Sequence, residues 1–215
     1  MESVLVLIAA PGSGAIGGEI VALLREFGAG EPHWLAPGEA AEVATFPSLS
    51  EFLVAVREFP IDAVIVSANN RRKRLLVADM DSTMIVQECI DELAAAAGIG
   101  REVSQITTRA MAGELDFDEA LTERVRLLRG LDLAALDRVL RERISLTPGG
   151  LTLVATMKAH GAFTALVSGG FTQFTDAIGR RLGFDEYRAN RLLVADGRLT
   201  GEVARPILGQ EAKVN

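Results

Sequence analysis

The chain has 215 residues, a formal net charge of −7 and 49% hydrophobic residues, a composition that supports one or two packed domains and argues against wholesale disorder. The negative charge disfavours a nucleic-acid partner, which usually requires a basic surface. The N-terminal Met-Glu-Ser is acidic where a secretory signal is basic, and no apolar run approaches the ~20 residues that span a bilayer. With a single cysteine as well, we expect a cytoplasmic protein with no membrane partner.

Residues 1–70 are predicted to form one small α/β module. Short apolar runs indicate strands at residues 4–8, 33–35, 43–46 and 61–66. Apolar residues at helical spacing indicate helices at residues 16–27 and from Ser48 or Ser50 to Phe59. The resulting order, β-α-β-β-α-β, is that of a ferredoxin-like module.

A glycine-rich segment of this module favours a competing function. Gly12 to Gly17 matches Gly-x-Gly-x-x-Gly between a predicted strand and a predicted helix, which is typical of a dinucleotide site. No Asp or Glu ends a second strand about 20 residues later, and two strands follow where a strand, a helix and a strand are required. A glycine-rich turn is therefore the preferred interpretation.

A basic link at residues 71–74 is interpreted as solvated. The apolar run at 75–78 then leads directly into Asp79-Met80-Asp81. Such a run indicates a buried parallel strand with functional residues at its carboxyl end. Two carboxylates one residue apart can supply a nucleophile and a general acid/base, and they favour a hard cation when a phosphate approaches.

Residues 85–143 are predicted to be all helical. Two apolar stripes at helical spacing end at Gly98 and Gly130, and no strand pattern intervenes. A helical insert directly after a catalytic strand is most simply a cap over the site. Arg124 lies inside the second apolar stripe. A guanidinium on an inward face requires an anionic partner, which can be a substrate or a structural carboxylate.

The α/β pattern resumes after this insert. A helix from Pro148 to Gly161 precedes a strand at residues 162–167, and Ser168-Gly169-Gly170 is predicted to be a tight turn into a helix that ends near Gly183. A hydroxyl, backbone N–H groups and a helix N-terminus together favour an anion site. A hairpin that turns at Asp196-Gly197 follows.

Six segments carry a specific resemblance to a known family. They are Asp79-Met80-Asp81-Ser82-Thr83-Met84-Ile85, Gln87-Glu88-Cys89-Ile90-Asp91-Glu92-Leu93, Ile106-Thr107-Thr108-Arg109-Ala110-Met111, Gly113-Glu114-Leu115-Asp116-Phe117, Leu166-Val167-Ser168-Gly169-Gly170-Phe171-Thr172 and Pro206-Ile207-Leu208-Gly209. Residues 75–213 thereby resemble bacterial phosphoserine phosphatases of the haloacid dehalogenase superfamily. The resemblance implies an α/β fold with a doubly wound core, a helical cap at about 85–143 and, at residues 1–70, a small regulatory-type module. The implied reaction is Mg²⁺-dependent hydrolysis of phospho-L-serine through an aspartyl-phosphate, the last step of serine biosynthesis.

The resemblance also assigns roles to the reacting residues. Asp79 would be the nucleophile and Asp81 the general acid/base, and both would contact Mg²⁺, Asp81 through its backbone carbonyl. Ser168 and Gly169 would hold the transferring phosphoryl group, and Lys213 would balance charge between Asp79 and the phosphate.

Two further residues would recognise the serine part of the substrate. Glu88 would bind the ammonium group and Arg124 the carboxylate. Helical periodicity supports Arg124 independently, whereas Glu88 falls away from the apolar stripe of its helix unless that helix starts later. The expected partner is thus a small molecule, and a homodimer is compatible with the sequence.

One departure from the family pattern affects these expectations. A last motif of the Gly-Asp-Gly-x-Asn-Asp type, whose first Asp completes the metal site in the family, does not occur before Asn215, and Asp196-Gly197 lies in a predicted hairpin turn. We therefore expect a C-terminally truncated phosphatase whose strand at residues 75–78 lies at a sheet edge. The alternatives are an inactive or ligand-binding remnant, or an enzyme that hydrolyses or transfers phosphate from a related phosphomonoester.

Overall fold

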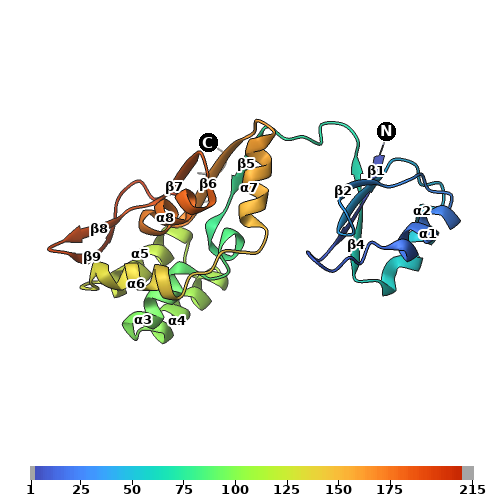
Figure 1. Ribbon diagram of the computed structural model, residues 1–215. Coiled ribbons are helices and arrows are strands. Elements are labelled where there is room, and N and C mark those ends of the chain that lie inside the picture. Colours follow the sequence, from blue (N-terminus) through green and yellow to red (C-terminus); the bar gives the residue numbers. More distant parts are fainter. Residues whose placement is uncertain (1–2, 210–215) are drawn as a thin grey trace. The chain divides into compact units, whose positions relative to one another are not determined.

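The protein divides into two compact units, Met1–Arg72 and Lys73–Asn215, with the boundary inside the basic link expected at residues 71–74. The computed structural model describes residues 3–209. Each unit has its own sheet and its own apolar core (Figure 1). No helix in the described range is long and apolar enough to cross a bilayer.

The first unit has the predicted order β-α-β-β-α-β. Its elements are β1 (Ser3–Ala9), α1 (Gly18–Glu26), β2 (His33–Ala36), β3 (Ala40–Val43), α2 (Leu49–Ala55), a 3₁₀ turn (Val56–Glu58) and β4 (Ile61–Ser67). The sheet has the order β2-β3-β1-β4 with antiparallel pairing throughout. Both helices contribute to one core with β1, which includes Leu5, Leu7, Ile20, Leu24 and Phe52. This is the ferredoxin-like arrangement.

The glycine-rich segment after β1 is a turn. Gly12 and Gly14 have φ values of 74° and 62°, and the Gly12 N–H donates to the Glu39 carboxylate at 2.6 Å. Because β1 pairs antiparallel with both of its neighbours, the segment lacks the parallel strand-helix-strand frame of a dinucleotide site. A carboxylate at the turn would also repel a pyrophosphate.

The predicted strand at residues 43–46 is wrong in its position. β3 ends at Val43, because the turn at Gly38, with φ of 75°, starts the pairing with β2 three residues earlier. The register with β1 places Val43 opposite Leu5, and the strand ends there. Ser48 occupies the N-cap position of α2, as one of the two predicted starts requires, although its side chain makes no capping hydrogen bond.

The second unit alternates between strands and helices around a cap of four helices. Its elements are β5 (Leu75–Ala78), a helical turn (Met80–Met84), α3 (Cys89–Ala97), α4 (Gly100–Met111), α5 (Phe117–Leu127), α6 (Leu133–Glu142), α7 (Gly150–Ala159), β6 (Phe163–Phe171), α8 (Thr172–Leu182), β7 (Glu186–Asn190), β8 (Leu192–Ala195) and β9 (Arg198–Val203). The helices α3 to α6 lie within the range predicted to be all helical. α5 begins with a capping box between Asp116 and Glu119, which explains its sharp start.

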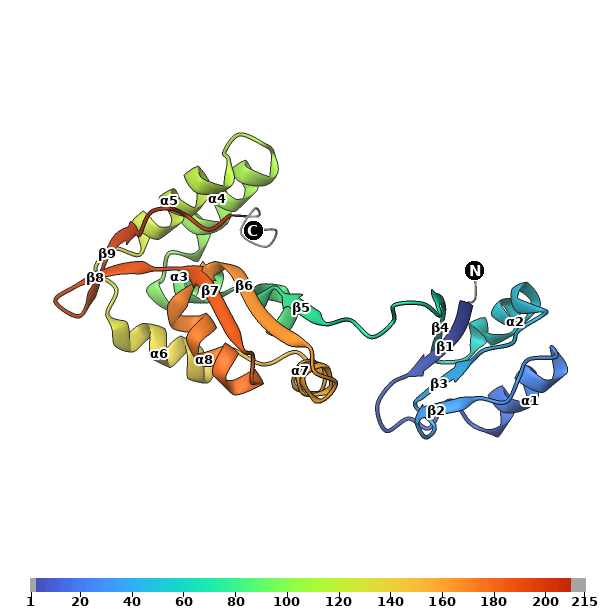
Figure 2. The same cartoon turned by 90° about the horizontal axis from the view of Figure 1, so that it is seen from above.

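The sheet of the second unit is parallel and has the order β5-β6-β7. α7 and α8 contact each other on the same side of β6 (Figure 2). β5 is an edge strand of the sheet that residues 3–209 form, as expected, and its Leu75 and Val77 side chains are 56% and 39% exposed. β8 and β9 form the predicted hairpin.

The strand β7 is not predicted by the sequence. Its residues, Glu186-Tyr187-Arg188-Ala189-Asn190, alternate between polar and apolar, but only two of the five are apolar and one of these is alanine. The strand forms because its backbone pairs with β6, where Ala165, Leu166 and Val167 provide a buried partner. An alternation with two apolar residues is too short a signal to predict a strand, and non-local pairing decides that this segment forms one.

The prediction of a tight turn at Ser168-Gly169-Gly170 is wrong. β6 continues through these residues to Phe171, and α8 starts only at Thr172. The pairing between β6 and β7 shifts in register between Val167 and Phe171, so the segment is an irregular strand end. Two consecutive glycines permit such a deformation because they carry no side chain to pack.

The contact between α8 and β7 leads to a prediction about stability. A Cβ atom added at Gly179 would lie 2.5 Å from Cδ1 and 3.1 Å from Cβ of Tyr187. Rotation of the tyrosine ring cannot relieve the second contact, so Gly179→Ala must displace α8 from the sheet. We expect the free energy of unfolding to fall by about 1–3 kcal/mol, as measured by denaturant titration.

The matched control for this prediction is Gly100→Ala, in the first turn of α4. A Cβ atom there would meet its nearest neighbour, Cα of Ala95, at 3.8 Å, an ordinary contact. This variant should be unchanged or more stable by about 0.4–1 kcal/mol. Equal stability losses in the two variants would contradict the steric explanation.

Candidate active site

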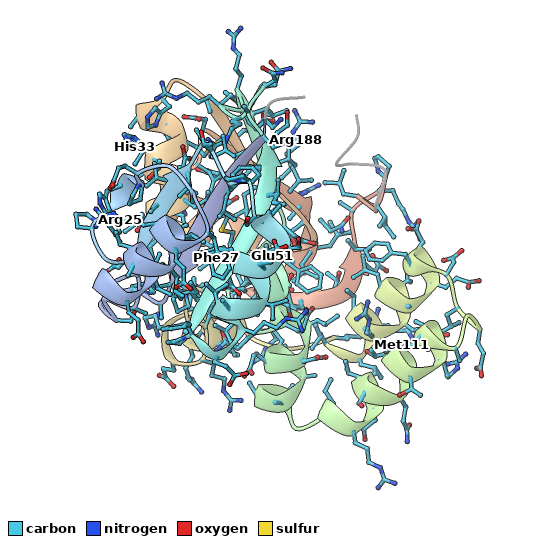
Figure 3. All side chains as sticks on the ribbon, turned by 90° about the vertical axis from the view of Figure 1, so that its right-hand side faces the viewer. Arg25, Phe27, His33, Glu51, Met111 and Arg188 are labelled. Atoms are coloured by element: carbon cyan, nitrogen blue, oxygen red, sulfur yellow. The ribbon has the colours of Figure 1, made fainter. Side chains whose placement is uncertain are left out.

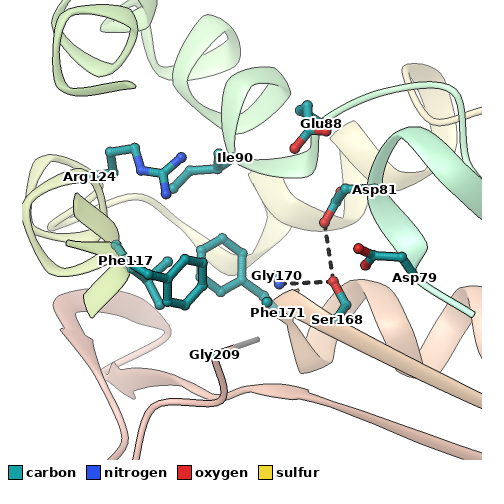
Figure 4. A pocket seen from close by; sticks show the side chains of 12 residues that line it. Asp79, Asp81, Glu88, Ile90, Phe117, Arg124, Ser168, Gly170, Phe171 and Gly209 are labelled. Atoms are coloured by element: carbon teal, nitrogen blue, oxygen red, sulfur yellow. Dashed lines mark hydrogen bonds between the residues drawn. The ribbon is translucent and has the colours of Figure 1, made fainter. Parts of the chain in front are cut away.

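The end of β5 places Asp79 at the mouth of a pocket. The Asp79 carboxylate accepts the N–H of Met80 at 2.8 Å, and the following turn contains two non-helical residues, Asp81 (φ −64°, ψ 136°) and Ser82 (φ 50°). The extended conformation of Asp81 interrupts the turn and directs its side chain toward β6 (Figure 4). The predicted carboxylate pair is thus brought to one site.

The Asp81 carboxylate is held between the cap and the sheet. One oxygen accepts the N–H of Cys89 at 2.9 Å, and the other accepts the Ser168 hydroxyl at 3.3 Å. Burial raises the pKa of Asp81, and the nearby Asp79 charge raises it further, against the effect of these hydrogen bonds. A carboxyl group with a raised pKa is suited to donate a proton and later to accept one.

The Ser168 hydroxyl also accepts the N–H of Gly170 at 2.9 Å. A Cβ atom at Gly170 would lie 2.7 Å from Oδ2 of Asp81, so glycine is required for the strand end to approach the carboxylate so closely. The pocket therefore presents a hydroxyl and strand backbone beside Asp79 and Asp81, which is an arrangement that can hold an anion.

Glu88 and Arg124 contact the pocket from the cap. Glu88 is the N-cap of α3, which starts at Cys89. The sequence pattern is compatible with Glu88 facing the site only if the helix starts after Glu88, and the structure has this later start. Its carboxylate accepts the Ser82 hydroxyl at 2.6 Å. Burial raises the pKa of Glu88, and the Asp81 charge adds to the effect.

Arg124 points from α5 toward the pocket (Figure 4). Burial lowers the pKa of its guanidinium, and the charges of Asp91 and Glu88 offset part of this effect. Its Nε donates to the Ala120 carbonyl at 3.2 Å. No ion pair within 4.0 Å among the described residues involves Arg124, which disfavours the alternative of a structural ion pair.

These residues line a single pocket of about 290 Å³. Six of the seven residues predicted for the site are among its lining: Asp79, Asp81, Glu88, Arg124, Ser168 and Gly169. The seventh, Lys213, lies outside the described residues. A pocket of this size suits a small polar ligand, and its lining carries three carboxylates and one guanidinium.

Phe117 and Gly209 also line the pocket, and the sequence pattern does not predict either of them there. Phe117 was expected in the apolar stripe of its helix, yet it is 39% exposed and reaches Gly169, where an added Cβ would lie 2.8 Å from its Cζ. Both residues belong to segments that resemble the family, and this resemblance is the sequence signal that could have identified them as site residues. Met111, in another such segment, is 85% exposed at the end of α4 (Figure 3).

Cys89 has no nucleophilic role in this geometry. Its side chain is buried, and burial together with the Asp81 charge raises the pKa of the thiol. A thiol that stays protonated is a poor nucleophile. Cys89 is therefore a small buried residue of the core.

The donors available to a metal are hard oxygens. Among residues 3–209 no set of three or more His, Cys, Asp or Glu side chains is grouped for a metal ion. Asp79, Asp81 and Glu88 nevertheless all line the pocket. An approaching phosphate would be strongly repelled without a cation, and oxygen donors of this kind are those that Mg²⁺ prefers.

Comparison with known proteins supports the resemblance. A family model described as haloacid dehalogenase-like hydrolase matches residues 76–215. A phosphoserine phosphatase of Archaeoglobus fulgidus is 50% identical over 147 residues, which are 68% of this chain and 42% of the relative. The chain therefore spans less than half the length of this curated relative.

Two solved structures extend the comparison to the fold. A HAD family hydrolase of Salmonella enterica serovar Typhi has a TM-score of 0.78 at 30% identity, over 98% of this chain and 75% of the other. A phospho-aspartyl intermediate analogue of phosphoserine phosphatase has a TM-score of 0.60 at 41% identity, over 65% of this chain and 66% of the other. The predicted α/β fold class is thereby confirmed, and the chain belongs to the haloacid dehalogenase-like hydrolases.

Proposed function

We propose that this chain hydrolyses O-phospho-L-serine to L-serine and phosphate. The observation that carries the proposal is the arrangement of one pocket, in which Asp79, Asp81 and Ser168 lie at the sheet while Glu88 and Arg124 face them from the cap. A carboxylate and a guanidinium on the cap side match the ammonium and carboxylate of serine. The names of the similar proteins support the same substrate.

Asp79 would attack phosphorus and become an aspartyl-phosphate, in keeping with the phospho-aspartyl analogue named for a similar structure. Asp81 would protonate the serine oxygen as the P–O bond breaks. The same carboxylate would then take a proton from the water that attacks the aspartyl-phosphate. The Ser168 hydroxyl and the backbone of Gly169 would hold the phosphoryl oxygens, and we assign Lys213 to charge balance between the phosphate and Asp79.

Mg²⁺ is the metal that fits these donors. The Asp79 carboxylate and the Asp81 backbone carbonyl would hold it, since Mg²⁺ often binds through one or two carboxylates together with waters and a substrate phosphate. When bound, it would neutralise the charge between the substrate dianion and the carboxylates.

The organisation of the chain follows from the two units. Residues 1–70 would be a small regulatory-type module, 71–74 a linker, and 75–215 the phosphatase core with its cap at about 85–143. The expected partner is phosphoserine, and the buried, unpaired Cys89 is compatible with the cytoplasm as the location. A homodimer stays a prediction.

Substrate recognition is tested with Arg124→Ala. Loss of a charge-assisted hydrogen bond is worth about 1.5–3 kcal/mol, so KM for phosphoserine should rise roughly 10–150-fold. KM for O-phosphoethanolamine, which has the ammonium group but no carboxylate, should change little. Phosphate release with Mg²⁺ measures both.

The matched control is Arg126→Ala, which removes an exposed guanidinium from the same helix and should leave both KM values unchanged. An equal rise in KM for the two substrates in Arg124→Ala would show that Arg124 stabilises the cap and does not bind the carboxylate. A wild-type chain that hydrolyses other phosphomonoesters but not phosphoserine would overturn the proposed substrate.

A further inference from the structure

One buried amide connects two walls of the pocket without lining it. Asn190, the last residue of β7, is 2% exposed. Its Nδ2 donates to the Gly169 carbonyl at 2.9 Å and to the Leu208 carbonyl at 3.2 Å, and its Oδ1 accepts the Leu208 N–H at 2.7 Å. Both amide N–H groups and the amide oxygen are therefore engaged with backbone from two other segments.

The bond to Gly169 fixes the direction of a pocket peptide. In a trans peptide the carbonyl and the next N–H point in opposite directions. The Gly169 carbonyl points to Asn190, and the Gly170 N–H therefore points away from it, to the Ser168 hydroxyl at 2.9 Å. The orientation of the Gly169–Gly170 peptide is thus set at one end by Asn190 and at the other by Ser168.

The bonds to Leu208 fix a second segment of the pocket wall. Both backbone polar groups of Leu208 are bound by the Asn190 side chain, in the manner of a paired strand. The next residue, Gly209, lines the pocket and lies against Phe117, since a Cβ atom added at Gly209 would meet Cδ1 of the ring at 3.6 Å. The Asn190 side chain therefore fixes the end of β6 and the segment Leu208–Gly209 relative to each other.

We propose that Asn190 is a positioning residue for the phosphoryl-binding part of this pocket. It acts by orienting the Gly169–Gly170 peptide and by holding Leu208–Gly209 beside it. This proposal rests on the proposed function only in taking that part of the pocket as the phosphoryl site. An isosteric carboxylate cannot replace the amide, because it has no N–H and would face two carbonyl oxygens.

The test compares Asn190→Asp with Thr164→Val in the full chain. Thr164 is also fully buried on β6, but at its other end, where its hydroxyl donates to the Asp185 carboxylate at 2.9 Å. Each variant loses two side-chain hydrogen bonds, and only Asn190→Asp loses one to a residue that lines the pocket. Three quantities are measured: the affinity for inorganic phosphate, the exchange rate of the Gly170 amide proton by NMR, and kcat and KM for phosphoserine and O-phosphoethanolamine.

In Asn190→Asp we expect phosphate affinity and kcat/KM on both substrates to fall about 10–100-fold, since a misplacement of about 1 Å at a reacting group has effects of this size. The Gly170 amide proton should exchange faster. Thr164→Val should leave all of these unchanged even if its melting temperature falls as far. Parallel changes in the two variants, or unchanged phosphate affinity and Gly170 exchange in Asn190→Asp, would overturn the proposal.

These readouts also separate the proposal from the proposed function. If the wild-type chain does not hydrolyse phosphoserine, the function fails. Phosphate affinity and Gly170 exchange still decide the role of Asn190.

Discussion

Asp79→Asn is expected to abolish phosphoserine hydrolysis. An amide cannot attack phosphorus. No other described carboxylate is placed to replace Asp79, since Asp81 is bound to Cys89 and Ser168, and Glu88 is bound to Ser82. The Met80 N–H that Asp79 accepts at 2.8 Å can be accepted equally by an amide oxygen. The variant should therefore fold normally while losing the covalent step.

Acid-quenched reaction with phosphate-labelled phosphoserine measures this step directly. The wild-type chain should retain label as an aspartyl-phosphate, and Asp79→Asn should retain none. Asp137→Asn, an exposed carboxylate on α6, is the control for the same chemical change and should label like the wild type. Label on the Asp79→Asn protein would exclude this residue as the nucleophile.

The parts of the site that follow from local pattern could be predicted from the sequence. Asp79 and Asp81 directly follow an apolar run, and such a run in an α/β protein becomes a parallel strand whose carboxyl end carries function. Arg124 interrupts an apolar stripe at helical spacing, so its inward direction follows from the helix alone. These residues lie in one pocket in the structure.

Glu88 shows where local pattern is insufficient. Successive side chains of a helix point about 100° apart, so a helical Glu88 would fall away from the apolar stripe, and the stripe does not show whether the helix includes Glu88. The structure starts α3 at Cys89 and leaves Glu88 in an extended N-cap conformation. The Cys89 N–H donates to the Asp81 carboxylate. This hydrogen bond satisfies one free donor of the first helical turn and favours a helix start at Cys89.

Asn190 could not be predicted, because each of its contacts is non-local. Its partners Gly169 and Leu208 are 21 and 18 residues away in the chain, and its strand carries only two apolar residues, Tyr187 and Ala189. The sequence predicts a turn at the irregular end of β6 for a similar reason, because the pairing that makes it a strand is non-local. Two glycines after an apolar run fit either structure, and the pairing with β7 decides between them.

Asp81→Asn is expected to slow phosphoserine hydrolysis without lowering stability. The asparagine is isosteric, and its amide oxygen can still accept the Cys89 N–H. Burial disfavours the ionised form of the native carboxyl group, so a neutral side chain should leave the melting temperature, measured without metal, equal or higher. A fall in melting temperature would point to a structural role for Asp81.

The rate effect follows from the two proton transfers assigned to Asp81. Serine is a poor leaving group and needs a proton as the P–O bond breaks, so we expect phosphoserine hydrolysis to fall by roughly 10²–10⁴-fold. p-Nitrophenyl phosphate has a good leaving group, so its first step should be slowed much less. Its second step still requires activation of water, and the aspartyl-phosphate on Asp79 should therefore accumulate.

Rapid mixing of Asp81→Asn with p-nitrophenyl phosphate distinguishes these steps. A burst of nitrophenol that approaches one equivalent of enzyme, followed by slow turnover, is the expected result. Equal slowing of both substrates with no burst would mean that Asp81 does not transfer these protons and that its effect comes from placing Ser168, whose hydroxyl it binds at 3.3 Å. The burst thus separates a proton-transfer role of Asp81 from a positioning role in the same pocket.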